Sequence, residues 1–226
     1  MSFAEQYGPW ALVAGASDGV GAAMAFEAAR RGLNVVLLAR RQTVLDQVAT
    51  SIRAATEVQT RTVAVDLASP GAAAEVITAT ADLEIGFLVY CAGADPTVEH
   101  FLAQPISAAE SMVQRNCMVP LQLAHHYAGP MVERGRGGIV IFGSGAGFAG
   151  GPNMVAYGAS KAFDMVFAEV PLSVRDTQVW HYRAGRHDGD MWWRHGGCSA
   201  RLTHVTRSNR ASHAVRPNQL NERGQQ

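Results

Sequence analysis

Lysine is almost absent from the sequence: Lys161 is the only one, and the other 18 of the 19 basic residues are arginines. Net charge is also absent, because 19 acidic residues balance the basic ones. A neutral chain has no overall field that attracts nucleic acid or an anionic membrane surface, so we expect neither as a partner. The chain lacks an uncharged apolar run of membrane-spanning length, and MSFAEQYGPW lacks the pattern of a secretory leader. The sequence therefore predicts a cytoplasmic protein without a membrane span.

Cysteine is scarce as well. Cys91, Cys117 and Cys198 are odd in number and form no C-x-x-C or metal-ligand spacing. This pattern argues against a secreted disulfide framework and fits a reducing cytosol. His125 and His126 are adjacent, so they lie on different faces of a helix and imply no third ligand. We expect no metal site.

Short continuous apolar runs alternate with alanine-rich segments over most of the chain. Continuous runs of this length are typical of parallel strands buried on both faces, and they cover residues 10–14, 35–38, 62–65, 87–90 and 139–142. The segments between them are long enough for crossover helices and cover residues 21–32, 43–56, 71–81 and 107–133. The pattern predicts an α/β fold: a doubly wound parallel sheet, Rossmann-like, in a three-layer α/β/α domain over residues 1–176.

Glycines and polar residues follow every predicted strand. In open parallel sheets, ligands bind beyond the carboxyl ends of the strands, so these residues form one set of candidate site residues. They are residues 15–21 after the first run, Arg40 and Arg41 after the second, Asp66 and Leu67 after the third, Ala92 and Gly93 after the fourth, and Ser144 after the fifth.

The first of these segments is glycine-rich. Gly15, Gly19 and Gly21 follow a strand and open a helix, with Ser17, Asp18 and Val20 between them. Without Cβ atoms the backbone turns tightly and lets a pyrophosphate approach the amides at the helix N-terminus. The motif predicts a dinucleotide site; the alternative is a plain glycine-rich turn.

The charge after the second strand indicates which dinucleotide binds. In dinucleotide-binding folds an acid about twenty residues after the glycines binds ribose hydroxyls, whereas a basic residue suits a 2′-phosphate. Arg40 and Arg41 occupy this place, with no acid nearby. We therefore expect NADP as the preferred cofactor, with NAD as the other possibility. The alternative is a solvated arginine pair.

Tyr157 and the single lysine, Lys161, are four residues apart on a predicted helix, so their side chains share a face and can meet. A free tyrosine is ionised in only about one molecule in a thousand at neutral pH, and an adjacent ammonium lowers its pKa. Ser144, thirteen residues before Tyr157, offers a hydroxyl that could bind a substrate oxygen. The alternatives are a solvent-facing helix pair and an ordinary turn serine.

Asn116 lies inside the long helical segment, in QRNCMVP. Asparagine is a poor residue for a helix interior because its amide competes with the backbone. We expect a local kink or a bound water there, or else a surface position.

Together, AGASDGVG, VDL, CAG, Asn116, GSGAG and YGASK resemble the short-chain dehydrogenase/reductase family over about residues 8–170. The resemblance implies hydride transfer between a nicotinamide cofactor and a small-molecule carbonyl or alcohol. It implies that Tyr157 exchanges the proton, Ser144 orients the substrate oxygen and Asn116 anchors a relay water. Lys161 would hold the cofactor ribose and lower the tyrosine pKa, Asp66 would lie near the adenine, and Ala92 and Gly93 would lie along the cofactor. It also implies a homo-oligomer, paired through the helices that carry Asn116 and Tyr157.

Two departures are visible within the matching region. Ala14 stands where the family often has threonine, and Tyr90 and Cys91 stand where paired asparagines are frequent. We expect these to alter strand packing more than chemistry, with Cys91 as a small core residue.

The end of the chain, residues 177–226, departs from the family pattern. From residue 171 it carries nine arginines against four acidic residues, and beyond a weak strand over residues 177–183 we expect little structure. Pro171 would end or kink the preceding helix. Our hypothesis is a C-terminus replaced by a shifted reading frame; the alternative is a natural basic arm. Since a substrate lid and a last strand are missing from this segment, a nucleotide-binding protein without turnover is the second candidate function.

Overall fold

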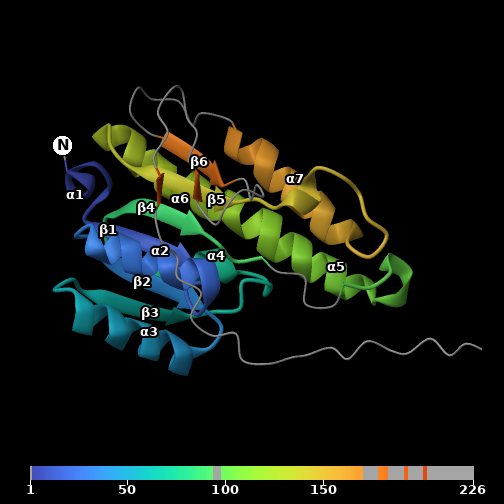
Figure 1. Cartoon of the computed structure of the whole chain (residues 1–226), viewed down its shortest axis with the longest axis horizontal. Helices are drawn as coiled ribbons and strands as arrows, with labels where there is room; N and C mark the ends of the chain where they lie inside the picture. Colours follow the sequence, from blue (N-terminus) through green and yellow to red (C-terminus); the bar gives the residue numbers. More distant parts are fainter. Residues whose placement is uncertain (1, 94–97, 170–177, 183–190, 193–200, 203–226) are drawn as a thin grey trace, which may run out of the picture.

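The protein is built around a six-stranded parallel sheet with strand order β3-β2-β1-β4-β5-β6 (Figure 1). The computed structural model describes residues 2–93, 98–169, 178–182, 191–192 and 201–202. The strands of the sheet are β1 Trp10–Ala14, β2 Asn34–Ala39, β3 Thr60–Ala64, β4 Ile85–Tyr90, β5 Gly138–Phe142 and β6 Gln178–Tyr182. The predicted parallel sheet is confirmed.

Helices follow the strands and cover both faces of the sheet. The helices are α1 Phe3–Tyr7, α2 Gly19–Arg30, α3 Gln42–Ala55, α4 Ala72–Ala79, α5 Ile106–Val113, α6 Val119–Arg134 and α7 Val155–Glu169. A π-helical turn, η2 (Gln114–Met118), joins α5 to α6, and short 3-10 turns lie at η1 (Phe101–Ala103) and η3 (Gly145–Gly147).

The core is divided by the sheet because successive strand residues point to opposite faces. Leu12 packs with residues of α4 and α6, such as Val76 and Leu123, whereas Val13 packs with α2 and α3. Burying one such side chain stabilises the fold by about 1.5–3 kcal/mol relative to leaving it exposed. The two clusters confirm the predicted three-layer α/β/α architecture.

One strand expectation is wrong: β3 is not buried on both faces. Among the described strands it pairs with β2 alone, at the sheet's edge, and its residues are half-buried or exposed. Arg61 in this strand donates to the carboxylate of Asp82, the kind of polar contact that an edge strand accommodates. The apolar run extended to Val65, which is buried but lies after the strand.

The helix α1 was not anticipated from the sequence. Ser2 caps it: its hydroxyl accepts from the amide of Glu5, and the Glu5 carboxylate accepts from the amide of Ser2, which is a capping box. Phe3 and Tyr7 then pack against Phe87 of β4. This helix closes the end of the sheet opposite to the candidate site.

The weak strand expected at residues 177–183 is present as β6, which pairs in parallel with β5. A two-residue antiparallel pair, β7 (Met191–Trp192) with β8 (Arg201–Leu202), lies further along. Pro171, Cys198 and most of the predicted basic tail lie outside the described residues, so the replaced C-terminus, the basic arm and the domain boundary at residue 176 stay predictions. No helix in the described ranges is long and apolar enough to cross a membrane.

Candidate active site

The glycine-rich turn between β1 and α2 has the geometry that only glycine tolerates. Gly15 and Gly19 have positive φ angles of 86° and 57°. A Cβ on Gly21 would lie 2.1 Å from the carbonyl oxygen of Gly15. Asp18 is the N-cap of α2, and its carboxylate accepts from the amide of Gly19 at 2.7 Å. The turn is therefore held tightly at the start of the helix, where amides face outward.

A cavity of about 330 Å³ lies over the carboxyl ends of β1, β2 and β4. It is lined by Gly15, Ser17, Asp18, Ala39, Arg40, Arg41, Val65, Asp66, Leu67, Cys91, Ala92, Gly93 and Arg115. Nine residues predicted to bind a cofactor are among them. Gly19, Val20 and Gly21 lie beside the cavity in the turn and the first turn of α2, and Tyr157 and Lys161 lie on α7.

Four residues of the cavity wall, Ala39, Val65, Cys91 and Arg115, were not predicted as site residues. Cys91 packs against the core as expected, but it also lines the cavity, and burial raises the pKa of its thiol. Arg115 reaches the wall from the π-helical turn. Only its place beside Asn116 in the sequence could have indicated it, and a π-helical turn is not visible from spacing.

Lys161 is buried, with 3% of its surface exposed. Its Nζ donates to the carbonyl oxygen of Phe142, at the end of β5, and to Oδ2 of Asp164, both at 2.8 Å. These are the hydrogen bonds of its ammonium in this structure, in place of the contact with the Tyr157 hydroxyl that the spacing favoured. Asp164 was missed because an acid three residues after a helical lysine is typical of a solvated pair.

Burial of Asp164 raises the pKa of its carboxyl to about 6, and the neighbouring Lys161 ammonium opposes that rise. Asp164 is 1% exposed. The two charges therefore form an ion pair in the interior, at 2.8 Å.

Asn116 is completely buried, so the surface alternative for this residue is wrong. The expected local irregularity is present as the π-helical turn η2. The Asn116 amide donates to the hydroxyl of Ser160 at 2.9 Å, and that hydroxyl donates to the carbonyl oxygen of Tyr157 at 2.8 Å. Nε of Arg115 donates to Oδ1 of Asn116 at 3.2 Å. The π-helical turn is thus tied to the first turns of α7.

Gly93 connects the cavity with these polar groups. A Cβ placed on Gly93 would lie 2.9 Å from Oδ1 of Asn116 and 3.2 Å from Nζ of Lys161, and its φ of 142° lies in the region that favours glycine. The cavity wall at Gly93 therefore contacts both side chains directly. The ammonium of Lys161 therefore lies just behind this part of the cavity wall.

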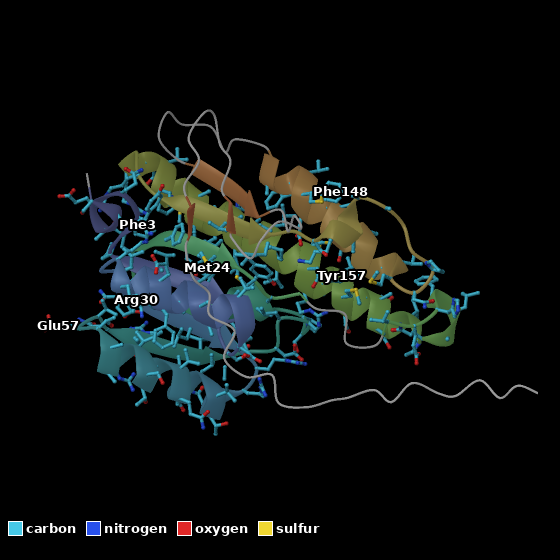
Figure 2. The ribbon with its side chains drawn as sticks, in the orientation of Figure 1. Phe3, Met24, Arg30, Glu57, Phe148 and Tyr157 are labelled. Carbon is cyan, nitrogen blue, oxygen red and sulfur yellow. The ribbon has the colours of Figure 1, made fainter. Side chains whose placement is uncertain are left out.

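Ser144 and Tyr157 lie on two elements that pack closely. Ser144 caps η3, and its hydroxyl accepts from the amide of Ala146 at 3.2 Å. A Cβ on Gly147 would be 2.8 Å from the Ala162 amide, so η3 lies directly on α7. Tyr157 is half-buried in the first turn of α7 (Figure 2).

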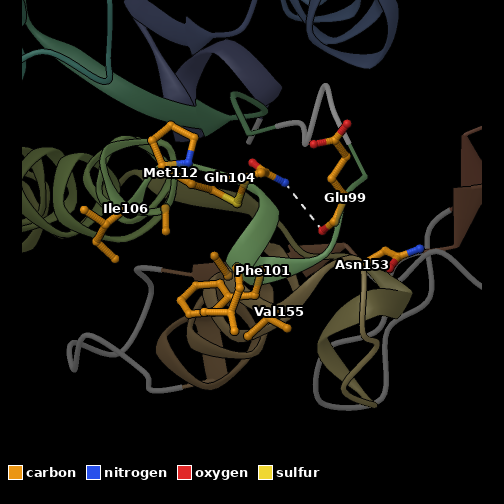
Figure 3. A pocket seen from close by; sticks show the side chains of 11 residues that line it. Glu99, Phe101, Gln104, Ile106, Met112, Asn153 and Val155 are labelled. Carbon is orange, nitrogen blue, oxygen red and sulfur yellow. Dashed lines mark hydrogen bonds between the residues drawn. The ribbon is translucent and has the colours of Figure 1, made fainter.

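A smaller hollow of about 130 Å³ lies next to the N-terminus of α7 (Figure 3). It is lined by Glu99, Phe101, Leu102, Gln104, Pro105, Ile106, Ala109, Met112, Asn153, Val155 and Ala156. Figure 3 shows Phe101 beside Val155. Nε2 of Gln104 donates to the carbonyl oxygen of Glu99 at 3.5 Å across the rim. The lining is mainly apolar and includes the residue that directly precedes Tyr157.

Nothing in the described part of the chain resembles a metal centre: no three His, Cys, Asp or Glu side chains gather there. A doubly wound sheet with a glycine turn and a cavity over its carboxyl edge defines a dinucleotide-binding protein. The model of the short chain dehydrogenase family matches residues 9–173, and the chain belongs to this family.

Individual relatives share about a third of their residues with the chain. It is 36% identical over 173 residues to a 7beta-hydroxysteroid dehydrogenase of Clostridium sardiniense, a match that covers 75% of this chain and 64% of that protein. Among solved structures, a short-chain dehydrogenase from Sphingobium yanoikuyae in complex with NADPH is similar with a TM-score of 0.72 and 34% identity, covering 77% of this chain and 70% of that one. A bulky-bulky ketone specific alcohol dehydrogenase from Comamonas testosteroni is similar with a TM-score of 0.73 and 33% identity, covering 78% and 72%.

Proposed function

We propose that the protein is an NADP-preferring oxidoreductase that interconverts a carbonyl group and a secondary alcohol. One observation carries this proposal: Gly93, in the cavity wall, lies next to Oδ1 of Asn116 and Nζ of Lys161. It brings the cavity over the carboxyl ends of the strands to the helix that bears Tyr157.

The residues present fit a dinucleotide. A Cβ at Gly15 would lie 2.9 Å from the amide nitrogen of Ala92, so this wall of the cavity admits no side chain there and keeps backbone close to a ligand. The glycine turn and the amides at the start of α2 would hold the pyrophosphate, Asp66 and Leu67 would lie at the adenine end, and Ala92 and Gly93 would follow the cofactor. When bound, a nicotinamide cofactor supplies or accepts the hydride.

Protein groups would supply the proton and the orientation. The Tyr157 hydroxyl would give a proton to the substrate oxygen on reduction and take it back on oxidation. Ser144 would donate a hydrogen bond to the same oxygen, which stabilises the charge that develops on it. Lys161 would hold the ribose, and Asn116 would anchor a water that returns the proton to solvent.

The preference for NADP rests on charge. Arg40, Arg41 and Arg115 all line the cavity, and a guanidinium pairs with phosphate through two parallel hydrogen bonds. The acid Asp66 follows β3, not the β2 end where a 2′-hydroxyl would be bound.

The substrate in this proposal is a bulky apolar carbonyl compound. The hollow lined by Phe101, Met112 and Val155 adjoins the first turn of α7 and offers apolar surface near Tyr157. Relatives named for a hydroxysteroid and for bulky-bulky ketones support the same class.

The proposal also includes a homodimer. Apolar side chains are exposed on α5, at Ile106 and Val113, and on α7, at Val155 and Val166. Two copies that met through these helices would cover them.

The experiment is NADPH oxidation measured against ketones of increasing size, with wild type and Tyr157→Phe side by side. Turnover by wild type and its loss in the variant support the proposal. NADPH-dependent thermal stabilisation without oxidation of any ketone would favour the second candidate, a nucleotide-binding protein without turnover.

A further inference from the structure

Asp164 is a buried acid that the proposed chemistry does not use. It lies three residues after Lys161 on α7, and its Oδ2 accepts from the Lys161 ammonium at 2.8 Å. Its other oxygen, Oδ1, is buried, and no described residue donates a hydrogen bond to it. Placing two charges in the interior is expensive unless both are fully paired.

Packing alone does not account for this acid. A buried ion pair replaced by apolar residues of similar volume is often neutral or more stable, and the unpartnered Oδ1 adds to its cost. The groups around it offer no second cation: the described titratable neighbours that act on Asp164 or Lys161 are Tyr90 from β4, Cys91 directly after β4 and Cys117 from η2. Burial raises the pKa of all three, that of Cys117 to about 11, so all three stay uncharged.

What the pair does is fix the position of the ammonium. A lysine ammonium has three N–H donors on a flexible stem. Two of them are taken here, by the Phe142 carbonyl and by Asp164. The third remains for a ligand, and Nζ lies directly behind the cavity wall at Gly93.

We propose that Asp164 is a positioning residue: with the Phe142 carbonyl it holds the Lys161 ammonium behind Gly93, so that one N–H is ready for a ribose hydroxyl of the cofactor. The identity of that ligand rests on the proposed function; the fixing of the ammonium does not. Ordering the side chain before the ligand arrives removes part of the entropy loss of binding.

The single lysine makes a direct test possible, because lysine labelled at 15Nζ gives one side-chain signal from the full chain. Burial and hydrogen bonding slow the exchange of ammonium hydrogens with water, so we expect this signal to be visible in wild type. Asp164→Leu, which removes the acceptor at similar size, is expected to broaden or move it. Asp164→Asn, which keeps one acceptor, should give a smaller change and guards against a folding failure of the leucine variant. Asp82→Asn, at a surface pair with Arg61, is the matched control and should leave the signal in place.

Cofactor binding supplies the second measurement. We expect Asp164→Leu to weaken NADPH binding about tenfold to a hundredfold, the range for losing a hydrogen bond to a charged group. In a Lys161→Met background the same change should have no further effect, because the role of Asp164 passes through the ammonium.

The outcomes separate the two proposals. An unchanged lysine signal in both Asp164 variants, or an equal loss of NADPH binding with and without Lys161, overturns the positioning role. If the lysine signal changes in the Asp164 variants but wild type does not bind NADPH, the positioning role is supported and the proposed function is rejected.

Discussion

Asn116 and Ser160 are 44 positions apart in the chain and joined by a hydrogen bond of 2.9 Å in the interior. Asn116 lies in the π-helical turn η2 between α5 and α6, and Ser160 lies one turn beyond Tyr157 on α7. The Ser160 hydroxyl also donates to the Tyr157 carbonyl oxygen, so the position of the first turn of α7, which carries Tyr157, depends on the π-helical turn η2. A change at Asn116 therefore affects both stability and the placement of Tyr157.

Asn116→Ala is expected to destabilise the protein by about 2–3 kcal/mol. It opens a small cavity and leaves the buried Ser160 hydroxyl without its donor, and an unmade buried hydrogen bond costs about 1–3 kcal/mol. Urea unfolding at constant slope measures the change. Asn153→Ala, at an exposed asparagine, is the control; if the two variants unfold at the same urea concentration, the Asn116 bond contributes nothing.

Gly21→Ala is expected to disrupt the first turn and abolish cofactor-dependent stabilisation. The new Cβ would lie 2.1 Å from the Gly15 carbonyl oxygen, a contact that only backbone movement relieves. Gly150→Ala meets nothing within 4 Å and has no positive φ, so it should behave as wild type. Thermal unfolding with and without NADPH compares the two; an intact shift with NADPH in Gly21→Ala would contradict the tight turn.

The sheet was predictable because its strands are continuous apolar runs. Residues 10–14 were expected as a strand and form β1 with the same bounds. A strand buried on both faces is a continuous apolar run, so the ends of the run mark the ends of the strand. β3 was misjudged because an edge strand accommodates polar residues such as Thr60 and Thr62, which are half-buried and hydrogen-bond to side chains of α3. The burial of a strand depends on which strands lie beside it, and the order of the strands in the sheet cannot be read from the sequence.

The site was predictable where chemistry follows from a residue's place after a strand. The glycine turn, Arg40 and Gly93 came from that rule, and they line one cavity. Asp164 and Ser160 did not, because their importance lies in what they contact: Lys161 and Asn116, respectively. Burial of an ion pair is a property of packing, and a helical acid near a lysine is on average a surface feature.

Arg40→Ala should weaken NADPH binding about tenfold or more and leave NADH binding nearly unchanged. A charge-assisted hydrogen bond to phosphate contributes about 1.5–3 kcal/mol, and only NADPH carries the 2′-phosphate. Fluorescence titration with both cofactors gives the ratio. Arg30→Ala, on the exposed end of α2, is the control. Equal losses for both cofactors would reject the phosphate role of Arg40.

Tyr157→Phe should lower turnover by about a hundredfold to ten-thousandfold while the Kd for NADPH changes little, because the hydroxyl acts in proton transfer. Tyr127→Phe is a matched control with the opposite outcome. Its hydroxyl is paired with Thr80 at 2.7 Å in the core, so its loss should cost about 1 kcal/mol of stability and leave turnover intact. Comparable turnover by wild type and Tyr157→Phe would remove the tyrosine from the mechanism.

The stability of the protein should fall between about pH 4 and pH 7 through Asp164. Burial raises the pKa of this carboxyl from 3.8 to about 6, so the folded chain keeps the proton at pH values where the unfolded chain has lost it. Stability decreases with pH wherever the folded state binds more protons. The contribution of Asp164 is thus most favourable below pH 4 and declines as pH rises toward 6, by about 1–3 kcal/mol in total.

Unfolding of wild type and Asp164→Asn at several pH values isolates this effect, since asparagine does not titrate. We expect the stability of wild type, relative to the variant, to decline from pH 4 to pH 7. Asp82 should show the opposite dependence of stability on pH, because its hydrogen bond with Arg61 lowers the pKa of its carboxyl. Wild type should therefore gain stability relative to Asp82→Asn as pH rises through the acid range below 4. A pH-independent difference for Asp164→Asn would mean that its carboxyl titrates in the folded chain as it does in the unfolded one, and the raised pKa of the buried carboxyl would have to be abandoned.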